Sequence, residues 1–281
     1  MNGSLRAKPS EERSLRENFP LNQKKHYLCP KTIYPHSPTQ INTMDTSTFL
    51  TLFQEAFGPA APLPIVFGFS DTPASEVGSV PRCMIGAISK VRQGNPLTLC
   101  KENVKCGGGG LYTCFHPMPD RVPMFVSQVE HYKQTPEMVT QFIEGMDIQL
   151  THKSYLNFVR MDQVENLEEM EGVLFFATPD ILAGLTSWAF YDNNASDAVS
   201  TPFGSGCSSI VAMAVKENRD CGRRCFLGML DPSARLLVPK DELTFVIPLC
   251  RFREMMNTIK DSSLFQHAFS VVRKRINGEI G

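Results

Sequence analysis

The chain changes from strand to helix within residues 172–191, which read GVLFFATPDILAGLTSWAFY. The apolar run Val173–Ala177 is typical of a buried strand. Thr178-Pro179-Asp180 follows it as a helix cap, a first-turn proline and an acid. The stretch is nearly apolar enough for a membrane span, but Pro179 and Asp180 interrupt it. We therefore expect a strand–helix unit of a globular protein.

The same alternation extends outward in both directions along the chain. Short apolar runs predict strands at Pro64–Phe69, Thr98–Cys100, Val122–Val129, Phe226–Leu230 and Leu243–Ile247. Caps and amphipathic spacing predict helices after Asp45 or Thr46, over Pro81–Gln93, from Thr135, from Gly206 to about Glu217, from Pro248 and around Leu264–Val272. This mixture predicts an α+β fold, a mixed sheet covered by helices.

The first 43 residues differ in composition from the rest of the chain. They contain five prolines, and seven basic residues against three acids, without an amphipathic period. We expect residues 1–43 to be a disordered or mis-assigned N-terminal extension, with Met44 as the true start. Residues 44–281 are expected to form a single α+β domain.

The overall charge excludes one class of partner. Lysine plus arginine total 28 against 29 acids, a formal net charge of −1, so no basic field attracts a phosphate backbone and we expect no nucleic-acid partner. We expect no membrane partner either. The N-terminal region lacks the apolar stretch of a secretory signal, so a cytoplasmic location is expected. In that reducing compartment the nine cysteines would be thiols or metal ligands.

Three cysteines occupy chemically favourable positions. Pro81 as first helical residue would place Cys83 in a first turn, and Ser205 as cap would place Cys207 at the second helical position, where unpaired N–H groups stabilise a thiolate. Cys106 precedes four glycines, of which Gly107 and Gly108 could let the backbone approach a cofactor. The structural alternative is that these cysteines are small buried hydrophobes beside a mobile loop.

The spacing of these positions suggests an internal duplication. Cys106 follows Cys83 after 23 residues and a predicted strand, and Asp231 follows Cys207 after 24 residues and another predicted strand. A duplicated helix–strand unit would place Cys83 and Cys207 in equivalent positions, so that a pseudo-twofold arrangement brings them to one cleft.

Converging soft thiolates select a transition metal or an iron–sulfur cluster. Cys83, Cys106 and Cys207 are therefore our predicted metal ligands, although the chain lacks the Cys-x2-Cys pairs of zinc ribbons and bacterial ferredoxins. Cys221 and Cys225 could add ligands, form a redox pair or flank a surface turn. We expect a small molecule or a redox protein as the partner.

Two alternatives stay open. Cys207 could be the nucleophile of a thiol-dependent enzyme. We predict Gly107, Gly108, Gly228 and Arg235 as cofactor-binding residues around the thiols; alternatively, the glycines and Arg235 could hold a small anion, with the cysteines only structural. A phosphate loop, a dinucleotide fingerprint and a serine-hydrolase elbow are all missing from the sequence.

Several separated motifs, in order, resemble the bacterial and archaeal "domain of unknown function 169" family over about residues 64–259. They are Cys83 with Ala87 and Gly94, Cys106 with its glycines, Cys207 after Gly204-Ser205-Gly206, Gly228–Arg235, and Ile247-Pro248. The resemblance implies that the family's characteristic cysteines correspond to Cys83, Cys106 and Cys207, and its late glycine and arginine to Gly228 and Arg235. Cys100, Cys114, Cys221 and Cys225 lie outside this pattern. The resemblance supplies no reaction.

Overall fold

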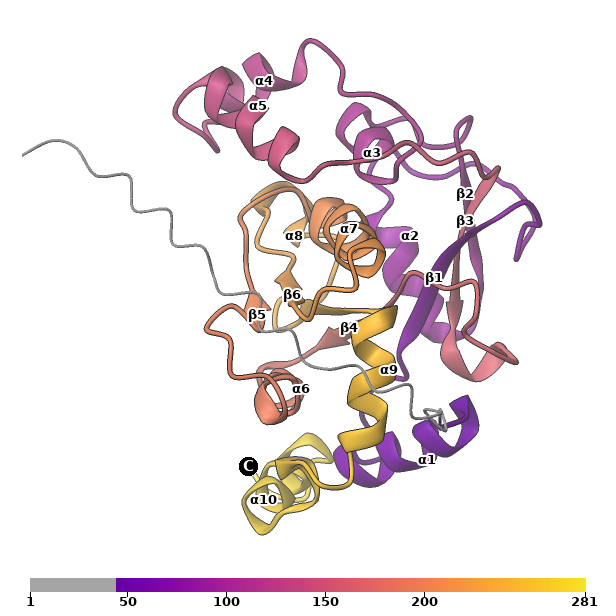
Figure 1. The fold of residues 1–281 in the computed structure, drawn as a ribbon, viewed down its shortest axis with the longest axis vertical. Helices are drawn as coiled ribbons and strands as arrows, with labels where there is room; N and C mark the ends of the chain where they lie inside the picture. The colour runs from indigo at the N-terminus through magenta and orange to yellow at the C-terminus, as the bar shows by residue number, and fades with distance from the viewer. Residues whose placement is uncertain (1–43) are drawn as a thin grey trace, which may run out of the picture. The chain divides into compact units, whose positions relative to one another are not determined.

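Residues 44–281, which a computed structural model describes, form one α+β domain around a seven-stranded sheet (Figure 1). The strands are β1 (Ile65–Ser70), β2 (Leu97–Cys100), β3 (Tyr155–Arg160), β4 (Gly172–Ala177), β5 (Val199–Ser200), β6 (Cys225–Gly228) and β7 (Leu243–Pro248). Their order is β2-β3-β1-β4-β7-β6-β5, antiparallel throughout except for the parallel pair β5–β6. The predicted fold class is confirmed. The expectation for residues 1–43 lies outside the described residues.

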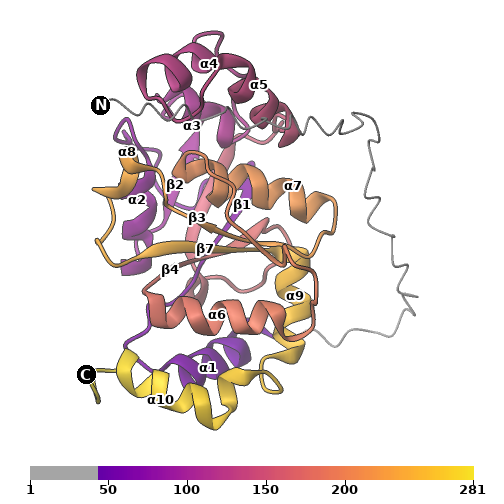
Figure 2. The same cartoon turned by 90° about the vertical axis from the view of Figure 1, so that its left-hand side faces the viewer.

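Four helices cover one face of the sheet, as Figure 2 shows. They are α1 (Thr46–Phe57), α6 (Pro179–Tyr191), α9 (Leu249–Thr258) and α10 (His267–Ile276). The predicted cap of the first helix is present, since Asp45 Oδ1 accepts a hydrogen bond of 2.9 Å from the Thr48 N–H. Phe49 of α1 meets Phe252 of α9 edge to face, with ring centroids 4.8 Å apart. Aromatic packing thus joins the first helix of the domain to a helix near its C-terminus.

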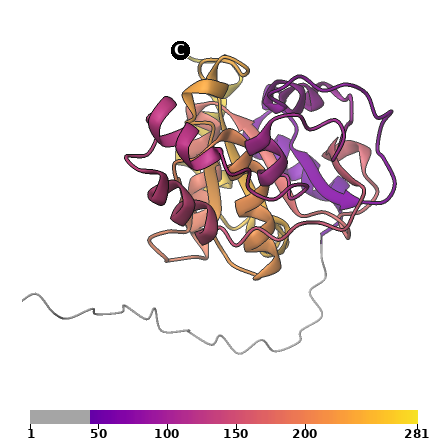
Figure 3. The ribbon, with the colours of Figure 1, turned by 90° about the horizontal axis from the view of Figure 1, so that it is seen from above.

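The opposite face carries two helical segments that begin beside the predicted site. They are α2 (Ile85–Lys90) and a helix in which the π-helical η4 (Ser208–Ala212) leads into α7 (Met213–Arg219). Beyond them lie α3 (Gly107–Tyr112), α4 (Val122–Met124), the π-helical η2 (Phe125–Val129), α5 (Pro136–Gly145) and α8 (Pro232–Arg235). Figure 3 looks onto this outer layer. None of the helices between residues 44 and 281 combines the length and apolarity that crossing a membrane requires.

The strand order is one that the predicted internal duplication would give. In the first half β3 lies between β1 and β2, and in the second half β7 lies between β4 and β6. A twofold axis between the antiparallel pair β1–β4 would exchange these halves and leave each face of the sheet on its own side. On the same face, α2 leads to β2 and α7 leads to β6, and a short helix, α3 or α8, follows each of these strands.

Two sequence predictions of local structure are wrong. Residues 122–129 are helical, not a strand, and their apolar side chains cover a cavity instead of filling the core: Phe125 is 49% and Val129 64% exposed. The helix predicted over residues 81–93 begins only at Ile85, so Cys83 precedes the helix instead of lying in its first turn. Strand β3 was not predicted from the sequence, although it pairs with both β1 and β2.

The glycine run is also not a loop, since Gly107–Gly110 begin α3. Glycine is a poor helix former, but close packing requires it here. A Cβ on Gly109 would lie 2.5 Å from the Met84 methyl carbon, and one on Gly110 would lie 2.5 Å from His116 Cδ2. The glycines therefore let α3 pack closely against its neighbours.

Candidate functional site

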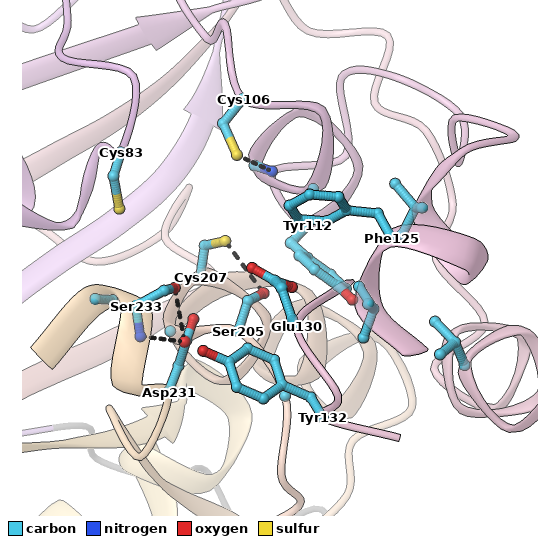
Figure 4. A pocket seen from close by; sticks show the side chains of 18 of the residues that line it. Cys83, Cys106, Tyr112, Phe125, Glu130, Tyr132, Ser205, Cys207, Asp231 and Ser233 are labelled. Carbon is cyan, nitrogen blue, oxygen red and sulfur yellow. Dashed lines mark hydrogen bonds between the residues drawn. The ribbon is translucent and has the colours of Figure 1, made fainter. Parts of the chain in front are cut away.

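A cavity of about 450 Å³ lies beneath the outer helices, and the side chains of Cys83, Cys106 and Cys207 all line it (Figure 4). Cys83 comes from the segment before α2, Cys106 from the start of α3, and Cys207 from the turn that enters η4. The predicted convergence of these three cysteines on one hollow is therefore present in the fold. A cavity of this size lies within the range that binds small molecules and cofactors.

Cys106 is fixed as the N-cap residue of α3. Its sulfur accepts a hydrogen bond of 3.4 Å from the Gly109 N–H, and its backbone is extended, as at other N-caps. Asp231 occupies the equivalent place in the second half of the fold, as the N-cap of α8. Its Oδ1 accepts hydrogen bonds from the N–H (2.9 Å) and the hydroxyl (2.7 Å) of Ser233. The duplication thus sets a thiol and a carboxylate at corresponding helix starts.

Cys207 is the most enclosed of the three. Its side chain is buried, and its sulfur lies 3.5 Å from the Ser205 hydroxyl. Burial raises the pKa of the Cys207 thiol to about 12. The Ser205 hydrogen bond opposes this increase, and the negative charges of ionised Cys106 and Cys83 add to it. At neutral pH this thiol stays protonated unless a cation enters the pocket.

Cys83 lies in the corresponding position at the start of α2 and is exposed. Although the residue is exposed as a whole, partial burial of its sulfur raises the pKa of the thiol, a hydrogen bond from the Ile85 N–H lowers it, and the charges of Cys106 and Asp231 raise it further. The pocket thiols are therefore electrostatically coupled. Charge on one disfavours charge on the next.

Carboxyl and phenol groups line the pocket beside the thiols (Figure 4). Burial and the charge of Asp231 raise the pKa of Glu130. Burial, Asp231 and Glu130 likewise raise the pKa of Tyr132. Burial is also the main reason that the pKa of Tyr112 is raised. In this part of the pocket the acidic side chains tend to stay neutral, so they can donate hydrogen bonds. A cationic ligand is favoured here over an anionic one.

The remaining wall is apolar and aromatic. Val122, Phe125 and Val126 come from α4 and η2, Val139 and Phe142 from α5, and Phe203 from the segment before η4. The Lys133 ammonium lies 4.8 Å from the Phe142 ring centroid and 6.0 Å from that of Phe203, so cation–π contacts hold this charge against the wall.

The described residues do not contain a preformed site for a single metal ion. Between residues 44 and 281, no three histidine, cysteine, aspartate or glutamate side chains are grouped closely enough to hold one ion. The three thiols therefore share a cavity without forming the compact tetrahedral arrangement of a structural zinc site.

The predicted cofactor-binding residues are divided between this pocket and other places. Gly108 lines the cavity, whereas Gly107 lines a separate hollow on the other side of Cys106. Gly228 and Arg235 lie outside the pocket lining. The Arg235 guanidinium donates to the backbone carbonyls of Glu242 (2.6 Å), Lys240 (2.8 Å) and Pro239 (3.3 Å). It therefore closes the turn after α8.

The other cysteines lie elsewhere. Cys100 and Cys114 are buried away from the pocket lining, and the sulfur of Cys225 lies in the core 4.0 Å from Met255 Sδ. Sequence reasoning missed Glu130, Tyr132 and Tyr112 in the pocket. Glu130 and Tyr132 follow the segment that was predicted to be a strand, and no pattern in the sequence reveals their tertiary neighbours.

Comparison with known proteins places the chain in a family. A family model, DUF169, described as "Uncharacterised ArCR", matches residues 61–258, which include every residue of the pocket named above. Searches of curated proteins and of solved structures found no significant match. The family match covers most of the chain and agrees with the motifs around Cys83, Cys106 and Cys207. The chain belongs to the DUF169 family.

Proposed function

We propose that the protein binds an iron–sulfur cluster, or a comparable centre of thiophilic transition metals, with Cys83, Cys106 and Cys207 as ligands. The observation that carries this proposal is that three thiols from separate segments line one cavity. Soft thiolate sulfur selects such centres over hard cations.

Electrostatics supports a cationic occupant. Burial, and after it the charges of neighbouring thiols, raises the pKa values of Cys83 and Cys207, so these two thiols resist ionising in a pocket without a cation. A metal centre supplies the positive charge that lets all three become thiolates. Binding would therefore release protons.

Among metal centres, a cluster requires a less compact set of ligands than a single ion does. No trio of suitable side chains among the described residues is compact enough for one ion. A polynuclear cluster is larger, and its cysteine ligands bind different iron atoms, so it needs thiolates that lie farther apart. With three cysteines, one position of a cluster would stay free for another ligand.

The apolar wall of the cavity leaves room for a small molecule beside the metal centre. The cavity of about 450 Å³ exceeds what three thiols and a small inorganic centre need, and its remaining wall carries Phe125, Phe142 and Phe203. We propose that a small, largely apolar molecule binds there, next to the centre.

The other hypotheses receive less support. Burial that raises the pKa of Cys207 to about 12 opposes its use as a thiolate nucleophile in the free protein. Arg235 donates to three backbone carbonyls outside the pocket, which opposes its use as an anion ligand there.

Anaerobic purification, or reconstitution with ferrous iron and sulfide, tests the proposal. We expect bound iron and acid-labile sulfide, and a brown protein with visible sulfur-to-iron charge-transfer absorption. The triple variant Cys83→Ala/Cys106→Ala/Cys207→Ala should lose all three signals, whereas Cys100→Ala should keep them, because Cys100 lies outside the pocket lining. Wild-type protein that stays colourless and free of metal would contradict the proposal.

A further inference from the structure

Cys221 and Cys250 form a second cysteine pair, outside the pocket lining. Cys221 follows α7, and Cys250 lies in the first turn of α9. Asn218 holds both backbones: its carbonyl oxygen accepts from the Cys221 N–H (3.1 Å), and its side-chain oxygen accepts from the Cys250 N–H (2.8 Å). The Asn218 amide also donates to Glu171 Oε2 at 2.8 Å, which fixes its orientation. The two cysteines are therefore held beside one another through a common residue.

The two side chains lie close enough to interact. Burial, and after it an interaction with the Cys221 thiol, raises the pKa of the Cys250 thiol to about 12. Cys221 is exposed and Cys250 is half-buried. An oxidant in solution therefore reaches Cys221 before Cys250, and the bonds to Asn218 keep the second cysteine beside the first.

The backbone conformation at Cys221 is a second, independent indication that a cysteine has a role at this position. Its φ of +47° lies in the left-handed region, where residues with a side chain are uncommon. The Gly222 N–H bonds to the Glu217 carbonyl (2.8 Å) and the Cys221 N–H to that of Asn218, the Schellman pattern that ends α7. Glycine is the preferred residue at this left-handed position. A cysteine stands there instead, although glycine would relieve the strain.

We propose that Cys221 and Cys250 are a reversible dithiol–disulfide site, separate from the metal site proposed for the pocket. With a peroxide as oxidant, the Cys221 sulfur is first oxidised to a sulfenic acid as hydrogen peroxide is reduced to water. The Cys250 sulfur then attacks this sulfur, the S–S bond forms, and the hydroxyl leaves as a second water with the Cys250 proton. A small thiol reductant returns both sulfurs to thiols by exchange.

The disulfide would join the end of α7 to the start of α9. It would enclose β6, α8 and β7, the segment that carries Asp231. Because a cross-link restricts the unfolded chain, the oxidised protein should have a higher Tm than the reduced protein.

The experiment uses the full chain without mutation. The reduced protein is treated with hydrogen peroxide, its free thiols are blocked with N-ethylmaleimide, and tryptic peptides are identified by mass. We expect a disulfide between peptides 220–223 and 241–251, with a mass lower by two hydrogens than their sum, that disappears after dithiothreitol. A link from Cys221 to Cys225 would appear instead between peptides 220–223 and 225–235.

Two variants sharpen the test. Cys225→Ala should still form the Cys221–Cys250 link, whereas Cys250→Ser should leave Cys221 trapped as a sulfenic acid that dimedone labels. A Cys221–Cys225 link, disulfides only between molecules, or lasting sulfenic acid at Cys221 in the wild type would each overturn the proposal. The readout does not require a metal in the pocket, so its result is separate from that of the cluster proposal.

Discussion

The pocket changes the pKa of the Glu130 carboxyl group. Burial and the charge of Asp231 raise its pKa above the ordinary value of 4.5, so the folded state favours the neutral carboxyl group. The unfolded chain releases this proton at lower pH than the folded protein. The stability associated with neutral Glu130 is therefore complete below about pH 4.5 and decreases as the pH rises through the raised pKa.

Glu130→Gln should remove this dependence. The variant should gain stability relative to the wild type as the pH rises from about 4 to 7, because glutamine stays neutral throughout this range. Urea unfolding at several pH values measures the difference in free energy of unfolding. A difference that stays constant, or one that favours the wild type at higher pH, would contradict the placement of Glu130 beside Asp231.

Single residues also show what sequence reasoning can find in a site. Cys83, Cys106 and Cys207 could be selected because thiols have distinctive chemistry and lie beside caps and glycines. Glu130 and Tyr132 could not be selected, since many similar residues occur on any protein surface. Their importance depends on contacts that the fold creates, such as the proximity of Asp231.

At the scale of elements, α3 gives a matched pair of glycine substitutions. A Cβ on Gly108 would meet only the Tyr112 ring, at 3.7 Å, whereas a Cβ on Gly110 would lie 2.5 Å from the His116 ring. The His116 ring is also held by its Nε2, 3.1 Å from the Lys101 carbonyl oxygen. Alanine therefore fits at the first position and clashes at the second.

Gly108→Ala should stabilise the protein by about 0.5 kcal/mol, because alanine is the better helix former. Gly110→Ala should destabilise it by about 1–3 kcal/mol, because the histidine and the helix must move apart. Denaturant unfolding of the two variants provides the comparison. Equal effects of both substitutions, or a stabilising Gly110→Ala, would show that α3 does not pack as described.

The elements also show where sequence patterns suffice. The helices that follow Asp45 and Thr135 were predicted because a cap precedes an amphipathic stretch, and both caps form hydrogen bonds. Residues 122–129 misled the prediction because they are apolar for a different reason: they cover a cavity instead of joining a sheet. Glycines stand in α3 because neighbouring side chains occupy the space that a Cβ would need.

At the scale of the whole molecule, a buried arginine connects the helices of one face. Arg251 of α9 is fully buried, forms an ion pair with Asp192 at the end of α6, and donates to the Ala189 carbonyl (3.2 Å). Arg251→Ala should cost about 2–5 kcal/mol, since it empties a fully buried position and removes one of the two arginines that pair with Asp192 and Glu254, Arg223 being the other.

Arg275→Ala is the matched control. Arg275 forms an ion pair with Asp180 between α10 and α6, but its side chain is 54% exposed. Its loss should cost less than about 1 kcal/mol. Thermal or urea unfolding separates the two cases, and similar losses for both variants would refute the buried role of Arg251.

The similar arrangement of the two halves of the sheet offers a reason why the pocket thiols meet. The two halves place Cys83 and Cys207 at corresponding helix starts, and Cys106 and Asp231 at corresponding N-caps. The spacing in the sequence already suggested this relation, and the sheet order agrees with it. The apolar wall of the pocket, which comes from α4, η2 and α5, lies outside the two similar halves. It could therefore not be inferred from the spacing of the cysteines.

The most direct test of the central claim measures iron and acid-labile sulfide in each single variant, Cys83→Ser, Cys106→Ser and Cys207→Ser, after anaerobic reconstitution. If the three thiols hold one centre, each variant should lose cluster absorption and bound iron relative to the wild type, while the fold stays intact by circular dichroism. A variant that is folded and still binds as much iron and sulfide as the wild type would contradict the claim that its cysteine is a ligand of a shared centre.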